Sequence, residues 1–522
     1  MEKDYPDSIT RTPQWQPIPG SNQVRNAEGG YTWHVSDLTY LERFLVLGIE
    51  GPSLYMSKQG RLNEVSGKLL KCLRERGKET LDLVYSVAAR GACFRYSTVL
   101  FALAAAGAYG SPEAKQRAEE VFNDVVKTGS HLFEFLAYAR RFRGWGRWLR
   151  RVVASWYKSR DIKELAYQMA KYKFRDGWSH KDVVYLTRPF EPGHSLWRWL
   201  LGKEAELPEL LVAVERLKRA SSPVEVVAIL EATPSITWEM VPSRWLREVA
   251  VWEILAPRMP LFALVRNLGR LSSIGYITKG SSGEEVVSER LAAPGAMRGA
   301  KIHPLKLLVA GAVYRAGRSA QLCWTPSKKI KRALDAAFEN SFSSVEPLGK
   351  RILVGLDVSG SMDDCKVYRS RGRRVIRISA REAAAALSLA MVKAEERCYI
   401  MGFSHRFMDL GITTADSYQS ALRKTQQPFG GTDCALPMVW ALENRIPIDV
   451  FQIYTDSETW FGRIHPSQAL QEYRQKMGIP AKLIVVAMYP NAQTIADPND
   501  PGMLDIIGFD PSIPEAIRAF AS

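Results

Sequence analysis

The stretch ILVGLDVSGSMDD, residues 352–364, decides the fold of the last third of the chain. Its apolar start, 352–356, is typical of a strand that is buried on both faces. The strand pattern ends at Asp357, and hydroxyl side chains follow at Ser359 and Ser361. Three such oxygens can point at one centre, and hard divalent cations prefer oxygen ligands. Taken alone, the motif is equally consistent with a serine-rich turn after a strand.

Two downstream segments favour the metal interpretation. Thr432 follows a Gly-Gly turn, and Asp456 ends a second apolar run at 450–456. In that order and context the candidate ligands resemble the complete metal-ion-dependent adhesion site of a von Willebrand factor A domain: Asp357, Ser359, Ser361, Thr432 and Asp456. The resemblance implies a divalent cation, for which we expect Mg²⁺ ahead of Mn²⁺ or Ca²⁺. Such domains can also keep these residues with the site empty.

The same region alternates apolar strands with helical patterns. We expect strands at 352–357, 398–403, 450–455 and 482–488, and helices at 379–396, 416–425 and 466–477. This alternation predicts a doubly wound α/β domain at 351–522, with a mostly parallel sheet and helices on both faces. Ligands of such sheets bind at the carboxyl ends of the strands, where Asp357 and Asp456 stand.

Residues 1–350 show a different sequence pattern. Residues 1–30 contain four prolines and predict an extended arm. Across 31–350 apolar residues recur at three- and four-residue spacing between Gly and Pro breaks, which predicts an α-helical domain of stacked, HEAT-like pairs. An irregular helical domain is the alternative. We expect the longest loop at 276–290, and a buried helix rather than a membrane span at 99–109.

Length and composition limit the classes of protein to which the chain can belong. With 522 residues, 46% hydrophobic and 24% charged, the chain predicts two or more soluble globular domains. The polar start shows no apolar signal region. The six cysteines are scattered, without a Cys-x-x-Cys pair, which argues against a zinc site or a disulfide framework. We therefore expect a cytoplasmic protein that is not in a membrane.

The net charge of +16 is unevenly distributed. Residues 351–522 hold 19 Lys and Arg and 19 Asp and Glu, so they are neutral. The first 350 residues hold the remaining 52 basic and 36 acidic residues and carry the whole excess. A basic domain joined to a neutral one indicates a polyanionic partner for the first.

The most basic window is 140–175. It holds twelve Lys and Arg residues against Asp161 and Glu164, interleaved with aromatic residues. Cationic groups neutralise phosphates, and exposed aromatic rings stack on unpaired bases. Alternatively, most of the aromatic residues belong to the core and the basic residues form a solvated face. The Lys and Arg side chains of such a face repel one another unless an anion neutralises them.

A helix start follows this window. Ser179 or Asp176 can cap a helix at 181–186. The cap would bring backbone donors together with Lys and His side chains, which suits a phosphate. His180 is alternatively a structural hydrogen-bonding residue, and its cationic neighbours are expected to lower its pKa.

Several segments along the whole chain are similar to the Ro family and to the TROVE module that Ro shares with bacterial relatives. They are WGRWLRRVVASWY (145–157), KYKFRDGWSHKD (171–182), MPLFALVRNLGRL (259–271), KIHPLKLL (301–308), LDAAFENSF (334–342), GGTDCALPMVWA (430–441), VFQIYTDSET (450–459), EYRQKMGIPAKLIV (472–485) and ADPNDPGMLDIIGFD (496–510). The resemblance implies a ring of HEAT-like helices closed by the A domain. It implies Y RNA on the outer basic surface and single-stranded 3′ ends of misfolded RNA in a central hole. Family RNA contacts include the histidine of the GWSHKD motif, here His180.

We expect the RNA contacts to come from the basic residues of this region: Arg140, Arg143, Arg147, Arg150, Lys163, Lys171, Lys173, Arg175, His180 and Lys181. Replacing Lys171, Lys173, Arg175 and His180 by Ala or Ser should strongly weaken the binding of Y-like RNA and leave the fold intact. Bacterial relatives work with a 3′-to-5′ exoribonuclease of the polynucleotide phosphorylase kind, so that partner is implied as well.

These observations favour a monomeric binding protein in noncoding-RNA quality control or turnover. The alternative is a metal-dependent adhesion scaffold, whose A domain captures a carboxylate of a partner while RNA binding is secondary. We do not expect an enzyme, because no general base neighbours Asp357 in sequence and no Walker-type loop is present. One departure from vertebrate Ro is the segment 366–377, with six basic residues and no acid. It is expected to touch RNA or nuclease if the metal face does, or else to form a solvated hairpin.

Overall fold

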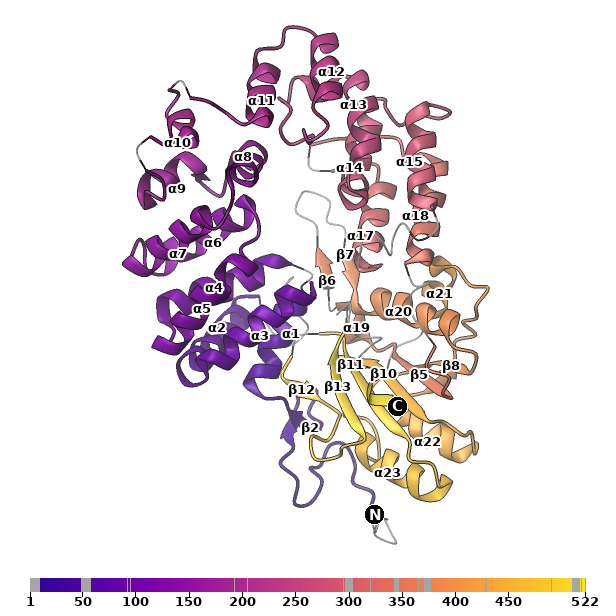
Figure 1. Cartoon of the computed structure of the whole chain (residues 1–522). Coiled ribbons are helices and arrows are strands. Elements are labelled where there is room, and N and C mark those ends of the chain that lie inside the picture. Colours follow the sequence, from indigo (N-terminus) through magenta and orange to yellow (C-terminus); the bar gives the residue numbers. More distant parts are fainter. Residues whose placement is uncertain are drawn as a thin grey trace.

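The protein is a ring of helices closed by an α/β domain, as the computed structural model shows (Figure 1). The structure describes residues 10–47, 58–91, 93, 95–191, 193–203, 205–293, 295, 304–319, 321–341, 347–364, 366–369, 377–427, 430–489, 491–508, 517 and 519–521. The helices run around a central opening, and the sheet domain lies between the first and the last of them (Figure 1). The predicted fold class is confirmed.

The first half of the ring consists of helices that pack against near neighbours in sequence. Its helices are α1 (Asp37–Leu47), α2 (Lys58–Glu75), α3 (Gly77–Arg90), α4 (Tyr96–Tyr109), α5 (Pro112–Val125), α6 (Gly129–Phe142), α7 (Arg147–Lys158), α8 (Ile162–Lys171), α9 (His180–Thr187) and α10 (Ser195–Leu200). Helix α3 packs on α5, and α4 packs on α6. The apolar run at 99–109 lies in α4 and is buried along most of its length, as predicted. Among the described residues, no helix is long and apolar enough to span a bilayer.

The second half continues the ring to the A domain. Its helices are α11 (Glu209–Arg219), α12 (Pro223–Ala232), α13 (Val249–Leu255), α14 (Leu261–Ser273), α15 (Ser282–Ala292), α17 (Pro304–Arg315) and α18 (Lys328–Asn340), with the 3-10 turns η1 (Trp245–Arg247) and η2 (Ala256–Arg258). The predicted loop at 276–290 is wrong, because most of it forms α15. Ser281 caps that helix by accepting from the amide of Glu284, and Val287 and Leu291, one turn apart, are fully buried.

The A domain is built on a six-stranded sheet in the order β13-β11-β10-β5-β8-β9. Its elements are β5 (Ile352–Asp357), α19 (Gly360–Asp364), β6 (Lys366–Arg369), β7 (Arg377–Ser379), α20 (Ala380–Ala394), β8 (Cys398–Phe403), β9 (Phe407–Asp409), α21 (Tyr418–Lys424), α22 (Leu436–Glu443), β10 (Val450–Thr455), α23 (Pro466–Met477), β11 (Lys482–Ala487), β12 (Gln493–Thr494) and β13 (Met503–Ile507). All neighbouring pairs are parallel except β8 with β9. Central strands β5 and β10 are buried at every residue, which explains their continuous apolar sequences.

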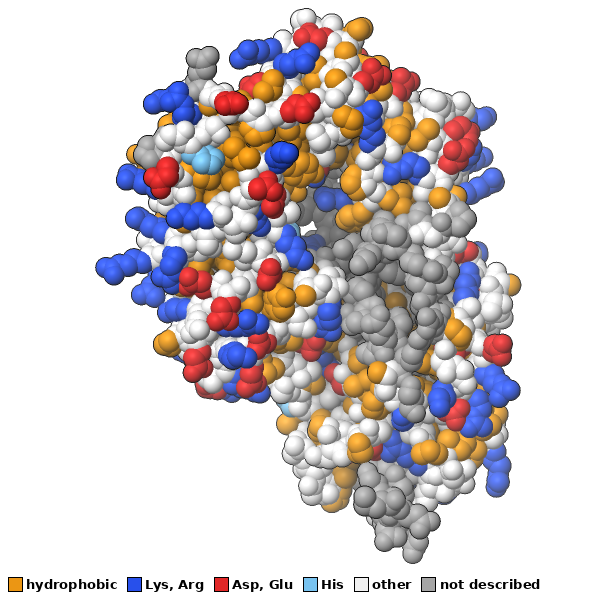
Figure 2. All heavy atoms as spheres, viewed as in Figure 1, with side chains coloured by type: hydrophobic (Ala, Val, Ile, Leu, Met, Phe, Trp, Pro, Cys, Tyr) orange, Lys and Arg blue, Asp and Glu red, His pale blue; other side chains and the backbone are white. Residues whose placement is uncertain are grey.

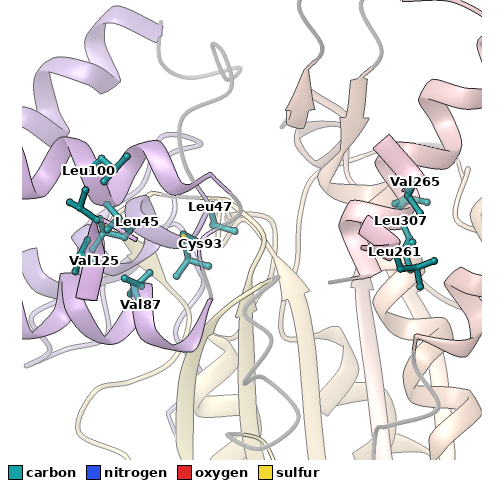
Figure 3. Packing of buried hydrophobic residues seen from close by; sticks show 14 of the residues in the cluster. Leu45, Leu47, Val87, Cys93, Leu100, Val125, Leu261, Val265 and Leu307 are labelled. Atoms are coloured by element: carbon teal, nitrogen blue, oxygen red, sulfur yellow. The ribbon is translucent and has the colours of Figure 1, made fainter. Parts of the chain in front are cut away.

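Buried apolar side chains fill both sides of the ring. Figure 3 shows Leu45, Leu100 and Val125 packed together on one side of the opening, and Leu261, Val265 and Leu307 on the other. Burying each such side chain contributes roughly 1.5–3 kcal/mol. Each side therefore has its own packed layer, and the opening lies between two well-packed walls.

The described part of the N-terminal arm, residues 10–30, packs against the A domain. Strands β1 (Val24–Arg25) and β2 (Tyr31–His34) pair with each other, and β2 pairs with β12 of the A domain. The arm thereby adds a small antiparallel sheet to the A domain before the chain enters α1.

Candidate nucleic-acid interface and metal centre

The predicted metal ligands meet at one edge of the A-domain sheet. Strands β5 and β10 are parallel neighbours, so Asp357 at the end of β5 and Asp456 directly after β10 share that edge. Both carboxylates are buried, with exposures of 0% and 1%. Ser359, Ser361 and Thr432 are also less than a tenth exposed. The structure therefore collects buried carboxylate and hydroxyl groups where the sequence places them.

Asp357 and Asp456 at this edge differ in the hydrogen bonds that their carboxylate oxygens accept. Asp357 accepts from the amide of Ser359 at 2.9 Å and from the hydroxyl of Thr455 at 2.7 Å. The hydroxyl oxygens of Ser359 and Ser361 lie 3.0 Å apart. Asp456 accepts through Oδ1 from the amide of Glu458 at 3.1 Å, whereas its buried Oδ2 has no hydrogen-bond partner in the described part of the chain. A buried, unpaired carboxylate oxygen is costly, so this atom fits the role of a cation ligand.

Burial also opposes the charged state of these acids. It raises the pKa of Asp357, and it raises the pKa of Asp456 together with the charges of Asp357 and Glu458. Arg381 is 3% exposed and donates to the carbonyls of Val358 and Ser359, and its positive charge partly offsets the rise in the pKa of Asp357. A divalent cation would favour the ionised pair.

The donor set is one of hard oxygens. No group of three His, Cys, Asp or Glu side chains suited to a metal occurs within the described ranges. A metal here would therefore depend on the hydroxyls of Ser359, Ser361 and Thr432 beside the two carboxylates. Oxygen donors of this kind suit Mg²⁺ better than Zn²⁺.

Three of the predicted RNA-binding residues line a cavity at the inner wall of the ring. This cavity has a volume of about 940 Å³, and its lining includes Lys171, Lys173, Arg175, Arg95 and Arg266. A second, more apolar cavity of about 800 Å³ shares Arg95 and Arg266 with the first. The two cavities are therefore adjacent, and residues from the start of α4 and from α14 line both of them.

The cations of the inner cavity are only partly neutralised by acids. Lys171 lies 3.9 Å from Glu239, and Arg175 pairs with Asp176 at 3.3 Å. Lys173 donates to the carbonyl of Met240 at 3.1 Å, and burial, followed by the charge of Lys218, lowers its pKa. Arg175 donates to the hydroxyl of Ser130 and lies 3.9 Å from Glu134. Between them Phe174 is 70% exposed. An open aromatic ring flanked by two cations is an arrangement that suits unpaired nucleotides.

The remaining basic residues lie elsewhere. Those outside the lining of the inner cavity are exposed: Arg140, Arg143, Arg147, Arg150, Lys163 and Lys181. Arg143 and Arg147 line a separate cavity of about 260 Å³ with Trp148. In Figure 2, Lys and Arg side chains gather along the edge of the ring where α6, α7 and α9 lie. The predicted RNA-binding set therefore divides into an inner group and an outer group.

His180, one of the predicted RNA contacts, lies in the core, as its alternative role as a structural hydrogen-bonding residue implies. Its ring is 2% exposed, packs 4.8 Å from the ring of Phe133, and shares a 2.8 Å hydrogen bond with the hydroxyl of Tyr157. Burial lowers its pKa to about 3, so the predicted direction is right but the cause is not the neighbouring cations. The predicted capping by Ser179 is confirmed, with Asp182 completing a capping box. A helix that begins at His180 buries this side chain, and contact of His180 with RNA stays a prediction.

The basic segment 366–377 lies partly outside the described residues. Its ends form the β6–β7 hairpin beside α19 and α20, and residues 370–376 are not described. In the view of Figure 1 the hairpin stands between the A domain and the opening of the ring. Its predicted contact with RNA or nuclease stays a prediction.

Family models match almost the whole chain. That of the TROVE domain matches residues 24–223 and 230–318, and that of the Ro60 vWA domain matches residues 351–521. The chain belongs to the Ro60 family. The Ro-like segments of the sequence predicted this membership, which is confirmed.

Relatives of the Ro60 family align over nearly their full length. "RNA-binding protein RO60" of Deinococcus radiodurans is 36% identical over 512 residues, which cover 96% of this chain and 95% of the relative. The protein of the same name from Caenorhabditis elegans is 30% identical over 608 residues, covering 98% and 92%. The crystal structure of the Deinococcus radiodurans RO (RSR) protein superposes with a TM-score of 0.69 at 34% identity and covers 93% of this chain and 99% of that one.

Sequence reasoning missed several residues of this Ro60-family cavity. Tyr96 and His131 stack with ring centroids 4.1 Å apart, and both line the two inner cavities. Burial, followed by the charge of Lys127, lowers the pKa of His131 to about 4. Arg95 and Arg266 join them from helices far apart in sequence. No local pattern singles these residues out, since each is an isolated polar residue at the start or in the middle of a helix.

Proposed function

We propose that this Ro60-family protein binds RNA in noncoding-RNA quality control or turnover. Single-stranded 3′ ends of misfolded or structured RNAs bind in the inner cavity, and a Y RNA binds on the outer basic surface. The observation that carries the proposal is the inner cavity of about 940 Å³ with five Lys and Arg residues in its lining. The two relatives named RNA-binding protein RO60 support it.

The inner cavity has the chemistry of a single-strand site. Its cations neutralise phosphates, and the exposed ring of Phe174 offers a stacking surface for a base. Because Lys173 is partly buried near Lys218, an anion would relieve the repulsion between the two ammonium groups. A double helix presents no unpaired bases to such a ring, so the cavity favours single strands.

The test is titration of a fluorescent single-stranded RNA into the full chain at several salt concentrations. With about five phosphate contacts, the slope of log K against log salt is roughly −3.5. A structured Y-like RNA is titrated in parallel as the outer-surface ligand. Affinity for neither RNA above that for a neutral control protein at moderate salt would refute the proposal.

A second candidate function is metal-dependent adhesion, favoured by the buried and unpaired Oδ2 of Asp456. In this proposal Asp357, Ser359, Ser361, Thr432 and Asp456 hold Mg²⁺, with Mn²⁺ or Ca²⁺ as substitutes. A bound cation would supply a coordination position for the carboxylate of a partner. The chain's own part is to hold the oxygens at the sheet edge and to keep Asp357 and Asp456 out of bulk water. Binding that requires Mg²⁺ and is nearly independent of salt would favour adhesion over RNA binding.

The proposal also covers the location of the protein, its oligomeric state and a nuclease partner. We place the protein in the cytoplasm as a monomer that binds RNA without cleaving it, while a 3′-to-5′ exoribonuclease of the polynucleotide phosphorylase kind degrades what it presents. Incubating labelled RNA with the protein and Mg²⁺, with and without that nuclease, tests the division of labour. Shortening of the RNA by the protein alone would contradict it.

A further inference from the structure

The N-terminal arm packs against the loops that carry the metal ligands. Residues 10–23 precede both family-model matches, which begin at 24 and at 351. Nevertheless Gln14 in this segment is 0% exposed, and Thr12 is 6% exposed. Its neighbour Arg11 pairs with Glu472 of α23 at 2.8 Å. The start of the described chain is therefore a docked part of the A domain.

The side chain of Gln14 is saturated with hydrogen bonds. Its Nε2 donates to Oδ1 of Asp433 at 2.8 Å and to the carbonyl of Ile464 at 2.8 Å. Its Oε1 accepts from the hydroxyl of Thr459 at 2.5 Å and from the amide of Gly462 at 3.3 Å. A Cβ on Gly462 would lie 2.2 Å from Nε2, so glycine is needed for the arm to approach.

These contacts converge on Thr432. Asp433 is its chain neighbour. The hydroxyl of Thr459, which donates to Gln14, also lies 3.2 Å from the carbonyl oxygen of Thr432, so its single proton is shared between the two acceptors. The amides of Trp460 and Phe461 donate to the same carbonyl at 3.0 and 3.1 Å. Gln14 thus fixes the loop that presents the hydroxyl ligand from both sides.

The arm also holds the loop that follows Asp456. Asn26 donates to the carbonyl of Thr459 at 2.7 Å, and the amide of Ala27 donates to Glu458 at 3.0 Å. A Cβ on Gly30 would lie 2.0 Å from the carbonyl oxygen of Thr459. The arm and this loop are therefore in direct backbone contact.

A second connection comes from the ring itself. Arg43 of α1 is 0% exposed and donates to Asp505 at 2.5 Å and to the carbonyl of Asn491 at 2.8 Å. The side-chain amide of Asn491 in turn donates through Nδ2 to the backbone carbonyl of Asp456 at 2.6 Å. The helical domain thus reaches the backbone of a metal ligand through one intermediate residue.

We propose that the N-terminal arm is a latch on the metal site, with Gln14 and Arg43 as positioning residues for Thr432 and Asp456. The inference rests on the proposed metal site. Docking of the arm and binding of the cation stabilise the same arrangement of loops, so each favours the other by the same factor.

The first experiment uses the unmodified full chain. Mn²⁺ affinity is measured by calorimetry, and trypsin cleavage after Arg11 is followed with and without Mn²⁺. Because Arg11 and Thr12 are held against α23, cleavage requires the arm to undock. Mn²⁺ should slow this cleavage about tenfold, within the usual range of coupling between sites. An unchanged cleavage rate with bound Mn²⁺ would overturn the latch.

The second experiment uses the nearly isosteric variant Gln14→Met, with Gln16→Met on the exposed neighbouring position as the matched control. We expect Gln14→Met to bind Mn²⁺ about tenfold more weakly and to lose the protection, and Gln16→Met to keep both. A lower melting temperature with unchanged Mn²⁺ affinity would show a purely structural role and overturn the proposal. If the unmodified chain binds no Mn²⁺, the metal site fails first, and the latch fails with it.

Discussion

The inner cavity and the metal edge are built in opposite ways. The cavity collects long, flexible cations from helices far apart in sequence, several of them exposed, around about 940 Å³ of open space. The candidate metal site at the sheet edge, here called the metal edge, consists of short oxygen-bearing side chains that are buried close to strand ends: Asp357, Ser359, Ser361, Thr432 and Asp456. The first site depends on summed charge, whereas the second depends on exact position.

This difference predicts how each site fails. A cavity that binds RNA through many weak, screened contacts loses part of its affinity with each cation removed, and its affinity falls as the salt concentration rises. A buried coordination shell loses its ligand almost completely when one carboxylate is removed, and responds little to salt. The following predictions test this contrast, beginning with the largest effect.

Replacement of Asp357 by Ala should weaken Mn²⁺ binding by more than about 100-fold, because changes to residues behind the ligands alone cost 10- to 100-fold. RNA binding by the helical ring should remain. Asp409→Ala, at an exposed carboxylate on β9, is the control. Calorimetry with Mn²⁺ and RNA titration measure the two affinities. Loss of RNA binding in a folded Asp357→Ala protein would make the metal edge the RNA anchor.

Replacing Lys171, Lys173 and Arg175 by Ala should weaken single-stranded RNA binding about 100-fold at 0.1 M salt and reduce the salt slope by about 2. The charge-matched control replaces the exposed Arg147, Arg150 and Lys163. That control should spare the single strand and weaken a structured Y-like RNA. Equal losses in both variants for both RNAs would remove the distinction between the inner and outer groups.

Acid should destabilise the ring through His180. Its folded pKa of about 3 lies below the unfolded value of about 6.5, so the unfolded chain binds the proton more tightly. This contribution is intact above pH 6.5 and is lost as the pH falls towards 3, by about 2 kcal/mol at pH 5. In His180→Gln, which does not titrate, the loss of unfolding free energy between pH 7 and 5 should shrink by that amount. Urea titrations at both pH values measure it, and parallel pH profiles would exclude His180 as the group.

The smallest predicted effect concerns Phe174. Removal of its exposed ring in Phe174→Ala should weaken single-stranded RNA about tenfold without changing the salt slope, since stacking releases no counterions. Phe174→Tyr keeps the ring and should keep the affinity. Fluorescence titration at three salt concentrations separates the two variants. A changed slope in Phe174→Ala would mean that the substitution displaces its cationic neighbours instead.

The sequence predicted the α/β domain well and the helical domain only in outline. The bounds predicted for β5, β8 and β10 agree with the structure, because continuous apolar runs identify buried central strands. The prediction of a loop at 276–290 is wrong. The polar stretch GSSGEE, residues 280–285, is typical of a loop, but it is equally typical of the first turn of a capped helix. Only the packing of Val287 and Leu291 decides for the helix.

The sequence by itself determined the donor set of the metal edge and the excess of positive charge in the first 350 residues. Strand ends and composition are local properties, so these features follow from the order of the residues. The tertiary structure alone decided that His180 is buried, that Lys171 and Arg147 belong to different surfaces, and that Gln14 reaches loops more than 400 residues away. The reason is physical: the direction of a side chain depends on which helices and strands pack against it, and those neighbours are distant in sequence.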